Sequence, residues 1–151
     1  MAMKDVTQKD DISCGYYAGF AVSVVNKAGE FSPELPMTKA DVEAARSKVP
    51  NPKTYLMPEG APAYLNEILK VEARYGNSDS RMVRLNQVRN FLKDGKALML
   101  GTQSHWIALV GLADQYTATV YNPAGKGQKV IDIFDLGMIG HWPYLVHPVP
   151  W

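Results

Sequence analysis

Cysteine is almost missing from this sequence: the 151 residues contain one, Cys14. A single cysteine cannot form an intramolecular disulfide, which excludes a disulfide-stabilised secreted scaffold. The sequence has no C-x-x-C pair and no H-E-x-x-H motif, and its three histidines are His105, His141 and His147. The zinc sites that depend on those patterns are therefore excluded. We expect the protein to need neither a metal nor an organic cofactor.

An excess of one charge is also missing. The chain has 16 Lys and Arg against 15 Asp and Glu, a formal net charge of +1, which argues against a nucleic-acid binder. No apolar run approaches the roughly 18 residues of a membrane span. The polar segment Met1–Asp11 shows no signal peptide, so the compartment stays open. Phosphate-binding glycine motifs are absent, and we interpret residues 125–127 as a turn.

What is present is a change of hydrophobic period after Gly95. Apolar residues recur at helical spacing before it and form short strand-like runs after it. The expected helices cover residues 13–27, 38–48, 62–75 and 86–93. The expected strands cover residues 97–100, 105–112, 117–121, 129–134 and, at an edge of the sheet, 144–146. The gaps between strands are too short for crossover helices, so we expect a largely antiparallel sheet in one α+β domain spanning 1–151.

The sole cysteine lies where the first helix is expected to begin. Asp10, Asp11 and Ser13 precede it as capping and negatively charged residues. The positive end of a helix dipole lowers the pKa of a thiol, and the free N–H groups of the first turn can bind an oxyanion. A lone cysteine is more often a small buried hydrophobic residue, so the hypothesis of a nucleophile rests on the residues around it.

Three further residues suggest chemistry around Cys14. Gln8 lies six positions before it, where a side-chain amide can complete an oxyanion hole. His105 opens an apolar strand and is suited to act as a general base. Asn122 follows across a hairpin and can hold the imidazole in one tautomer. Asp114 is an alternative orienting residue, although a residue at a hairpin tip usually faces water. The other two histidines lie near expected strand ends, where we interpret them as structural or exposed.

These residues together carry a family resemblance. Gln8, Cys14-Gly15, His105-Trp106 before an apolar strand, and Tyr121-Asn122-Pro123 follow one another as in a papain-like cysteine peptidase. The order is most similar to the compact bacterial peptidase C39-like group. The segment Leu92–Leu98 also resembles the helix and strand that precede the histidine in that group. Two positions depart from the pattern, because Ser13 and Asn122 stand where the C39-like group has Asp; an Asn at the second position is the choice of papain.

The resemblance implies a papain-like α+β fold with a Cys-His-Asn site. Cys14 would be the nucleophile, His105 the base, Asn122 its orienting residue, and Gln8 part of the oxyanion hole. The implied activity is a cysteine peptidase acting on a protein or peptide through a thioester. The same site could serve a deamidase or a peptidoglycan amidase, and the chain could be a bacterial effector or toxin domain with a cognate inhibitor or immunity protein. A non-catalytic binding module that kept the fold is the alternative from another class.

Overall fold

A computed structural model describes residues 1–76, 81–102, 104–125, 128–136 and 144–148. Its strands are β1 (Arg74–Gly76), β2 (Leu98–Gly101), β3 (Trp106–Asp114), β4 (Thr117–Tyr121), β5 (Gln128–Asp132) and β6 (Tyr144–His147). Its α-helices are α1 (Cys14–Ala28), α2 (Lys39–Arg46), α3 (Ala61–Ala63), α4 (Arg81–Lys93) and α5 (Ile133–Leu136). Short 3₁₀ turns, η1 (Met3–Asp5) and η2 (Pro58–Gly60), and a π-helical turn, η3 (Tyr64–Ile68), complete the chain.

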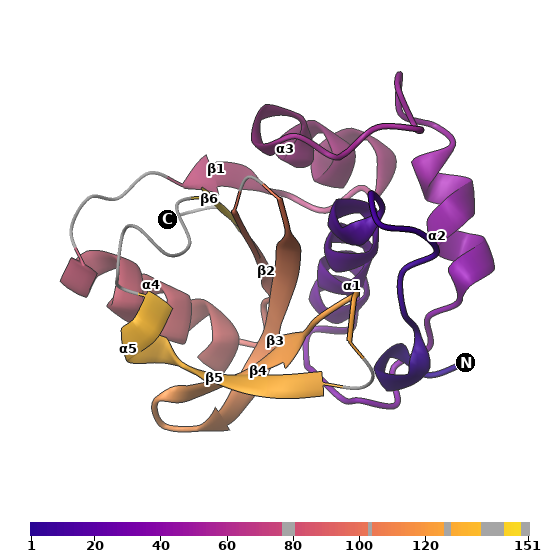
Figure 1. Cartoon of the computed structure of the whole chain (residues 1–151). Helices are drawn as coiled ribbons and strands as arrows, with labels where there is room; N and C mark the ends of the chain where they lie inside the picture. The colour runs from indigo at the N-terminus through magenta and orange to yellow at the C-terminus, as the bar shows by residue number, and fades with distance from the viewer. Residues whose placement is uncertain (77–80, 103, 126–127, 137–143, 149–151) are drawn as a thin grey trace.

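The six strands form one sheet in the order β1-β6-β2-β3-β4-β5, and every neighbouring pair is antiparallel. Figure 1 shows the sheet between α1 on one face and α4 with α5 on the other. The expectation of an α+β fold with a largely antiparallel sheet is therefore confirmed. Helices at the two faces explain why the central strands are apolar on both sides.

Side chains of the central strands alternate between two hydrophobic clusters. Met99 and Ala108 belong to the cluster on the α1 side, whereas Leu100 and Leu109 belong to the cluster on the α4 side. Successive residues of a strand point to opposite faces of a sheet. The short apolar runs of the sequence are thus the middle layer of a three-layer structure.

Helix α1 follows the sequence expectation within one residue at its C-terminus. Its apolar residues Tyr17, Ala21 and Val25 recur at four-residue spacing and are fully buried. Gly29 ends the helix with a left-handed φ of 78°, and its N–H donates to Val25 O, as glycine commonly does at this position. Because α1 begins at Cys14, the cysteine lies at the positive end of a fifteen-residue helix.

The third expected helix, 62–75, is wrong in its second half. The helical segment ends near Leu69, Lys70 takes a left-handed φ of 60°, and Arg74–Gly76 forms strand β1. This strand pairs with β6, so Arg74 lies opposite His147. The pairing is more than 70 residues away in the chain, which local periodicity cannot show.

Strand β6 also corrects an expectation, because it lies inside the sheet, between β1 and β2, rather than at its edge. The strand expected over 129–134 is β5, which ends at Asp132 because α5 begins at Ile133. Helix α4 begins at Arg81, five residues before its expected start at Asn86. Helix α2 ends two residues before the expected Lys48. Part of the expected turn at 125–127 and His141 lie outside the described residues.

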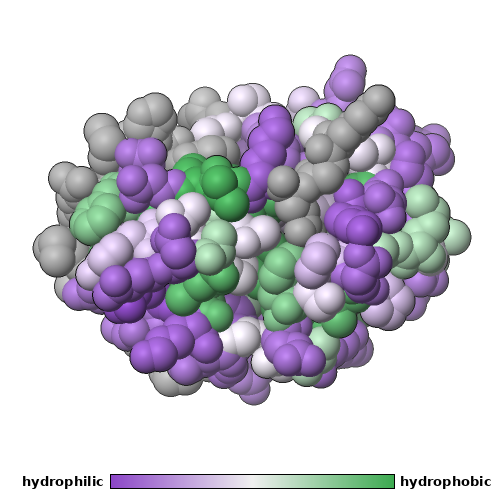
Figure 2. All heavy atoms as spheres, turned by 90° about the horizontal axis from the view of Figure 1, so that it is seen from below, coloured by the Kyte–Doolittle hydropathy of each residue, from purple (hydrophilic) through white to green (hydrophobic). Residues whose placement is uncertain are grey.

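The surface seen from below mixes hydrophilic and hydrophobic side chains in small groups (Figure 2). Across the described ranges, no helix has the length and apolar character needed to cross a membrane. The same ranges contain no cluster of three or more His, Cys, Asp or Glu suited to hold a metal ion.

Candidate active site

Cys14 is the first residue of α1 and is 1% exposed. Cys14 belongs to the hydrophobic cluster on the α1 side of the sheet. Ser13 precedes it and its backbone carbonyl accepts the N–H groups of Tyr16 and Tyr17. The thiol is therefore held by the start of a rigid helix and not by a loop.

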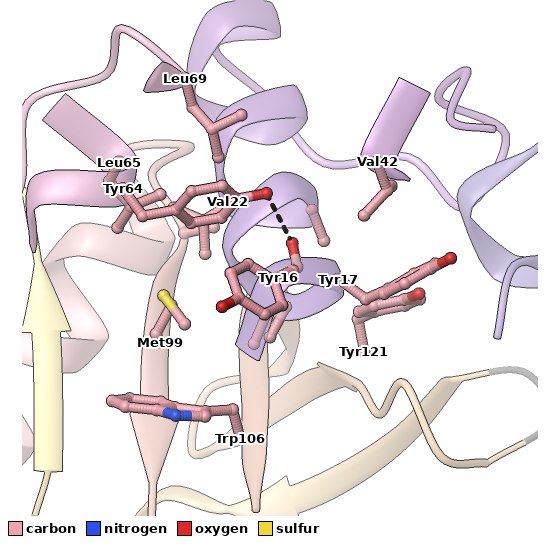
Figure 3. Packing of buried hydrophobic residues seen from close by; sticks show 14 of the residues in the cluster. Tyr16, Tyr17, Val22, Val42, Tyr64, Leu65, Leu69, Met99, Trp106 and Tyr121 are labelled. Atoms are coloured by element: carbon pink, nitrogen blue, oxygen red, sulfur yellow. Dashed lines mark hydrogen bonds between the residues drawn. The ribbon is translucent and has the colours of Figure 1, made fainter. Parts of the chain in front are cut away.

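Gly15 lets Leu56 and Trp106 pack closely against the start of α1. A Cβ atom at this position would lie 2.7 Å from Leu56 Cβ and 2.9 Å from Trp106 Cδ1. The indole Nε1 of Trp106 donates to Leu56 O at 2.8 Å, which joins the segment before η2 to the start of β3. Figure 3 shows the indole beside Met99, on the sheet side of α1. Cys-Gly at the helix start is thus a packing requirement as well as a motif.

The pKa of the Cys14 thiol is raised, because burial disfavours the thiolate. The backbone N–H groups of Trp106, Gly15 and Cys14 lower the pKa, but by less than burial raises it. These N–H groups stabilise negative charge near the sulfur, as the helix N-terminus does. The resting thiol is consequently neutral near pH 7.

His105 lies just before β3 and is joined to Asn122, just after β4. Its Nε2 lies 2.9 Å from Asn122 Oδ1. The same Oδ1 accepts the N–H of Ala124 at 3.1 Å, and this donor fixes which end of the amide is oxygen. An amide oxygen only accepts hydrogen bonds, so Nε2 must carry the proton of the neutral ring. Nδ1 is then the basic nitrogen of His105.

Gln8 reaches both halves of the site. Its backbone N–H donates to Pro123 O at 2.8 Å, which places it next to Asn122. Its side-chain Nε2 donates to Asp10 O at 2.6 Å, on the turn that leads into α1. The amide nitrogen has two N–H groups, so one remains for an oxyanion. A small cavity of about 310 Å³ adjoins this position, lined in part by Gln8, Pro123 and Ala124.

One direct hydrogen bond, between His105 and Asn122, joins two of the four residues singled out by the sequence, and neighbouring residues link the other two. Gln8 binds Pro123, Asn122 binds His105, and Trp106, the residue after His105, packs against Gly15, the residue after Cys14. The structure therefore gathers all four in one neighbourhood. Contact between the Cys14 thiol and the His105 ring is not among the hydrogen bonds of the described residues, and it stays a prediction.

The alternative candidates do not join this group. The Asp114 carboxylate accepts the N–H of Tyr116 at the hairpin tip. His147 is 2% exposed, is stacked with Phe91 and binds Pro148 O through Nδ1. It is structural, as the sequence indicated. The expected capping by Ser13 is wrong, because its hydroxyl closes a turn with the backbone of Asp10 and makes no cap bond to α1.

Sequence reasoning missed the residues that support the site. Arg46, at the end of α2, is 6% exposed and binds Asp10 and Glu43. Leu56 supplies the carbonyl that holds Trp106. In the sequence, Arg46 resembles an ordinary basic residue in the last turn of a helix, where its positive charge interacts favourably with the helix dipole. Only its burial distinguishes it, and no sequence signal announces that.

Comparison with known proteins adds a likeness of fold. No family model matches the chain, and no curated protein matches it either. Among solved structures, UfSP from C. elegans, a cysteine protease with a papain-like fold, matches with a TM-score of 0.50 and 19% sequence identity. The match covers 96% of this chain but 29% of the UfSP chain. The fold of this protein is therefore α+β and papain-like.

Proposed function

We propose that this chain is a cysteine peptidase-type hydrolase in which Cys14 attacks a peptide or amide carbonyl. The observation that carries the proposal is the hydrogen bond between His105 and Asn122, at 2.9 Å, which leaves Nδ1 as the base. The position of Cys14 at the start of α1 and the papain-like fold support it. A nucleophile, a base and a residue that orients the base are the parts that acyl transfer requires.

The first half of the reaction forms a thioester. As the sulfur of Cys14 bonds to the carbonyl carbon, its proton passes to Nδ1 of His105. The negative oxygen of the tetrahedral intermediate is bound by the Cys14 backbone N–H and by the free N–H of Gln8. The carbon–nitrogen bond then breaks, and the amine leaves with the proton from His105.

The second half restores the enzyme. A water molecule attacks the thioester carbon and gives one proton to His105 Nδ1. The carbon–sulfur bond breaks, and the sulfur recovers the proton. Throughout, Asn122 Oδ1 accepts a hydrogen bond from His105 Nε2–H. This bond keeps the ring in one orientation, whether the ring is neutral or protonated.

Turnover of an amide bond by the purified chain tests the proposal. A peptide mixture and, separately, peptidoglycan fragments are incubated with the wild type and with Cys14→Ala, and new N-termini and released ammonia are measured by mass spectrometry and enzymatic assay. New N-termini with the wild type alone indicate a peptidase. Ammonia without new N-termini indicates a deamidase, and release from peptidoglycan fragments indicates an amidase. Equal signals from both proteins would contradict the proposal.

The second candidate is a non-catalytic module, and one observation favours it. Cys14 is 1% exposed and has a raised thiol pKa, which are also the properties of a structural core cysteine. In that case, alkylation of Cys14 would not depend on His105. A narrower C39-like affiliation, and a role as a bacterial effector or toxin opposed by an immunity protein, belong to the proposal as extensions that the sequence resemblance suggests.

A further inference from the structure

Arg46 is a buried cation with an unusual set of partners. Its Nη1 binds Asp10 Oδ2 at 3.2 Å and Glu43 Oε1 at 3.3 Å, and its Nε donates to Pro52 O at 2.6 Å. The guanidinium also lies 5.0 Å from the centre of the Tyr16 ring. A buried charge is tolerated only when it is paired and hydrogen-bonded in this way. The side chain therefore ties α2, α1 and two loops together at one point.

Asp10 is the partner that leads toward the proposed site. Its Oδ1 accepts the N–H of Ile12 at 3.2 Å, and its carbonyl accepts the hydroxyl and the N–H of Ser13. The same carbonyl accepts Nε2 of Gln8 at 2.6 Å. The orientation of the Asp10 peptide thus determines where the Gln8 amide lies. The carboxylate of Asp10 is in turn held by Arg46.

The amide of Gln8 is also under-satisfied. Its Oε1 is buried and has no hydrogen-bond partner among the described residues. Such an amide gains little from its own oxygen and depends on its bond to Asp10 for its position. With one N–H of Nε2 committed to Asp10 O, the planar geometry of the amide fixes the direction of the other. That second N–H is the donor assigned to the oxyanion.

We infer that Arg46 is a positioning residue for the oxyanion side of the site, acting through Asp10 on the carboxamide of Gln8. The inference rests on the proposed function. It does not place Arg46 in contact with substrate. The guanidinium binds Asp10 through Nη1 and Pro52 O through Nε, so Pro52 fixes the cation that holds Asp10. A lysine ammonium does not reproduce this planar geometry.

The test separates two reactions of Cys14. Alkylation by iodoacetamide forms a carbon–sulfur bond and expels iodide, so it needs no oxyanion hole. Acylation by a peptide ester passes through a tetrahedral oxyanion and needs one. In Arg46→Met we expect acylation to fall roughly tenfold to a hundredfold, which is below the loss of about 10²–10³ typical of deleting a donor outright. Alkylation should stay within about twofold of the wild type. A parallel fall in both rates would overturn the inference.

Arg89 gives a matched control. It also donates to a backbone carbonyl, Gln115 O at 2.8 Å, and lies 5.2 Å from the Tyr116 ring, but it belongs to α4 on the other face of the sheet. Arg89→Met should leave both rates unchanged. A double-mutant cycle adds a second control, because Arg46→Met should have little further effect on acylation in a Gln8→Ala background. Additive losses would mean that Arg46 does not act through Gln8.

A structural readout makes the test independent of turnover. In the wild type, the side-chain NH₂ signals of Gln8 in a ¹H–¹⁵N spectrum should be displaced from free-amide positions and protected from exchange. In Arg46→Met, and in the milder Asp10→Asn, they should move to free-amide positions while the backbone spectrum is kept. Unmoved signals would overturn the inference. Absence of Cys14-dependent acylation in the wild type, with displaced Gln8 signals, would instead overturn the proposed function alone.

Discussion

The two halves of the candidate site are built by different kinds of bond. On the sheet, His105 lies just before β3 and Asn122 just after β4, two strands that pair in an antiparallel ladder. In the helical layer, Gln8 is positioned by a turn that depends on side-chain bonds and on the ion pair between the buried Arg46 and the half-exposed Asp10. Backbone ladders keep their geometry under most substitutions, whereas a side-chain network can be broken by one. The helical half should therefore be the more sensitive to charge changes.

The largest effect on the rate is expected from replacing the proposed nucleophile or the proposed base. Cys14→Ala and His105→Ala should each lower the rate of amide hydrolysis by at least about a thousandfold. Thermal melting should show that both proteins fold. Because Cys14 is 1% exposed, loss of its sulfur should cost about 1 kcal/mol of stability, a Tm decrease of roughly 2–4 °C. Unfolding of Cys14→Ala at room temperature would indicate a core cysteine.

The pH dependence of alkylation sharpens the role of His105. Burial raises the thiol pKa of Cys14, so in His105→Ala the alkylation rate should rise only at alkaline pH, above the ordinary range of a free thiol. In the wild type, Nδ1 accepts the proton, and alkylation should already be measurable near pH 7. Identical profiles, followed by mass spectrometry from pH 5 to 10, would show that the thiol is not activated by the ring.

Asn122→Ala tests the sheet half with a smaller change. Asn122 acts only by orienting the imidazole, so its loss should cost roughly 1–3 kcal/mol in transition-state stabilisation, the range of a lost buried hydrogen bond. Asn122→Asp should remain active, because a carboxylate also accepts Nε2–H. The rates of the wild type, Asn122→Ala and Asn122→Asp with one substrate test both expectations. A dead Asp114→Ala beside an unaffected Asn122→Ala would mean that the orienting residue is Asp114.

Gly15→Ala tests the contact between the helical layer and the sheet. The added methyl group would meet Leu56 and Trp106 at less than ordinary contact distance, so we expect a loss of about 1–3 kcal/mol in the free energy of unfolding. Gly60→Ala is the matched control, because its nearest neighbour would lie at 3.7 Å. Urea denaturation of both variants measures the difference. Equal stability would show that the packing around Trp106 is loose.

The smallest expected effect is a loss of folding stability at low pH, which should occur in a different pH range for each half of the site. His147 in the sheet has a pKa lowered by burial, so it binds a proton more readily when unfolded. Stability should fall as the pH drops below about 6.5, its ordinary value. Partial burial raises the pKa of Asp10, but the hydrogen bond and charge of Arg46 outweigh it and lower the pKa. The stability that this ion pair contributes is therefore lost only below about pH 4. It should stay under about 1 kcal/mol, because the Asp10 side chain is half-exposed. Melting curves of His147→Gln and Asp10→Asn against the wild type should show these two windows.

Much of the site was visible in the sequence because its residues lie in local patterns. The period of α1 placed Cys14 at a helix start, and the short turn between β3 and β4 placed Asn122 near His105. The spacing from Gln8 to the helix was also local. By contrast, the expected helix over 62–75 failed at its second half, because β1 forms against a strand near the other end of the chain.

The sequence by itself determined the helix that begins at Cys14 and the hairpin that carries His105 and Asn122, because each depends on neighbours within about twenty positions. Tertiary structure alone decided the place of β6 inside the sheet, the burial of Cys14, and the burial and ion pairing of Arg46. The physical reason is that burial and ion pairing depend on which surfaces meet in space. An arginine at a helix end looks solvated until two loops fold over it.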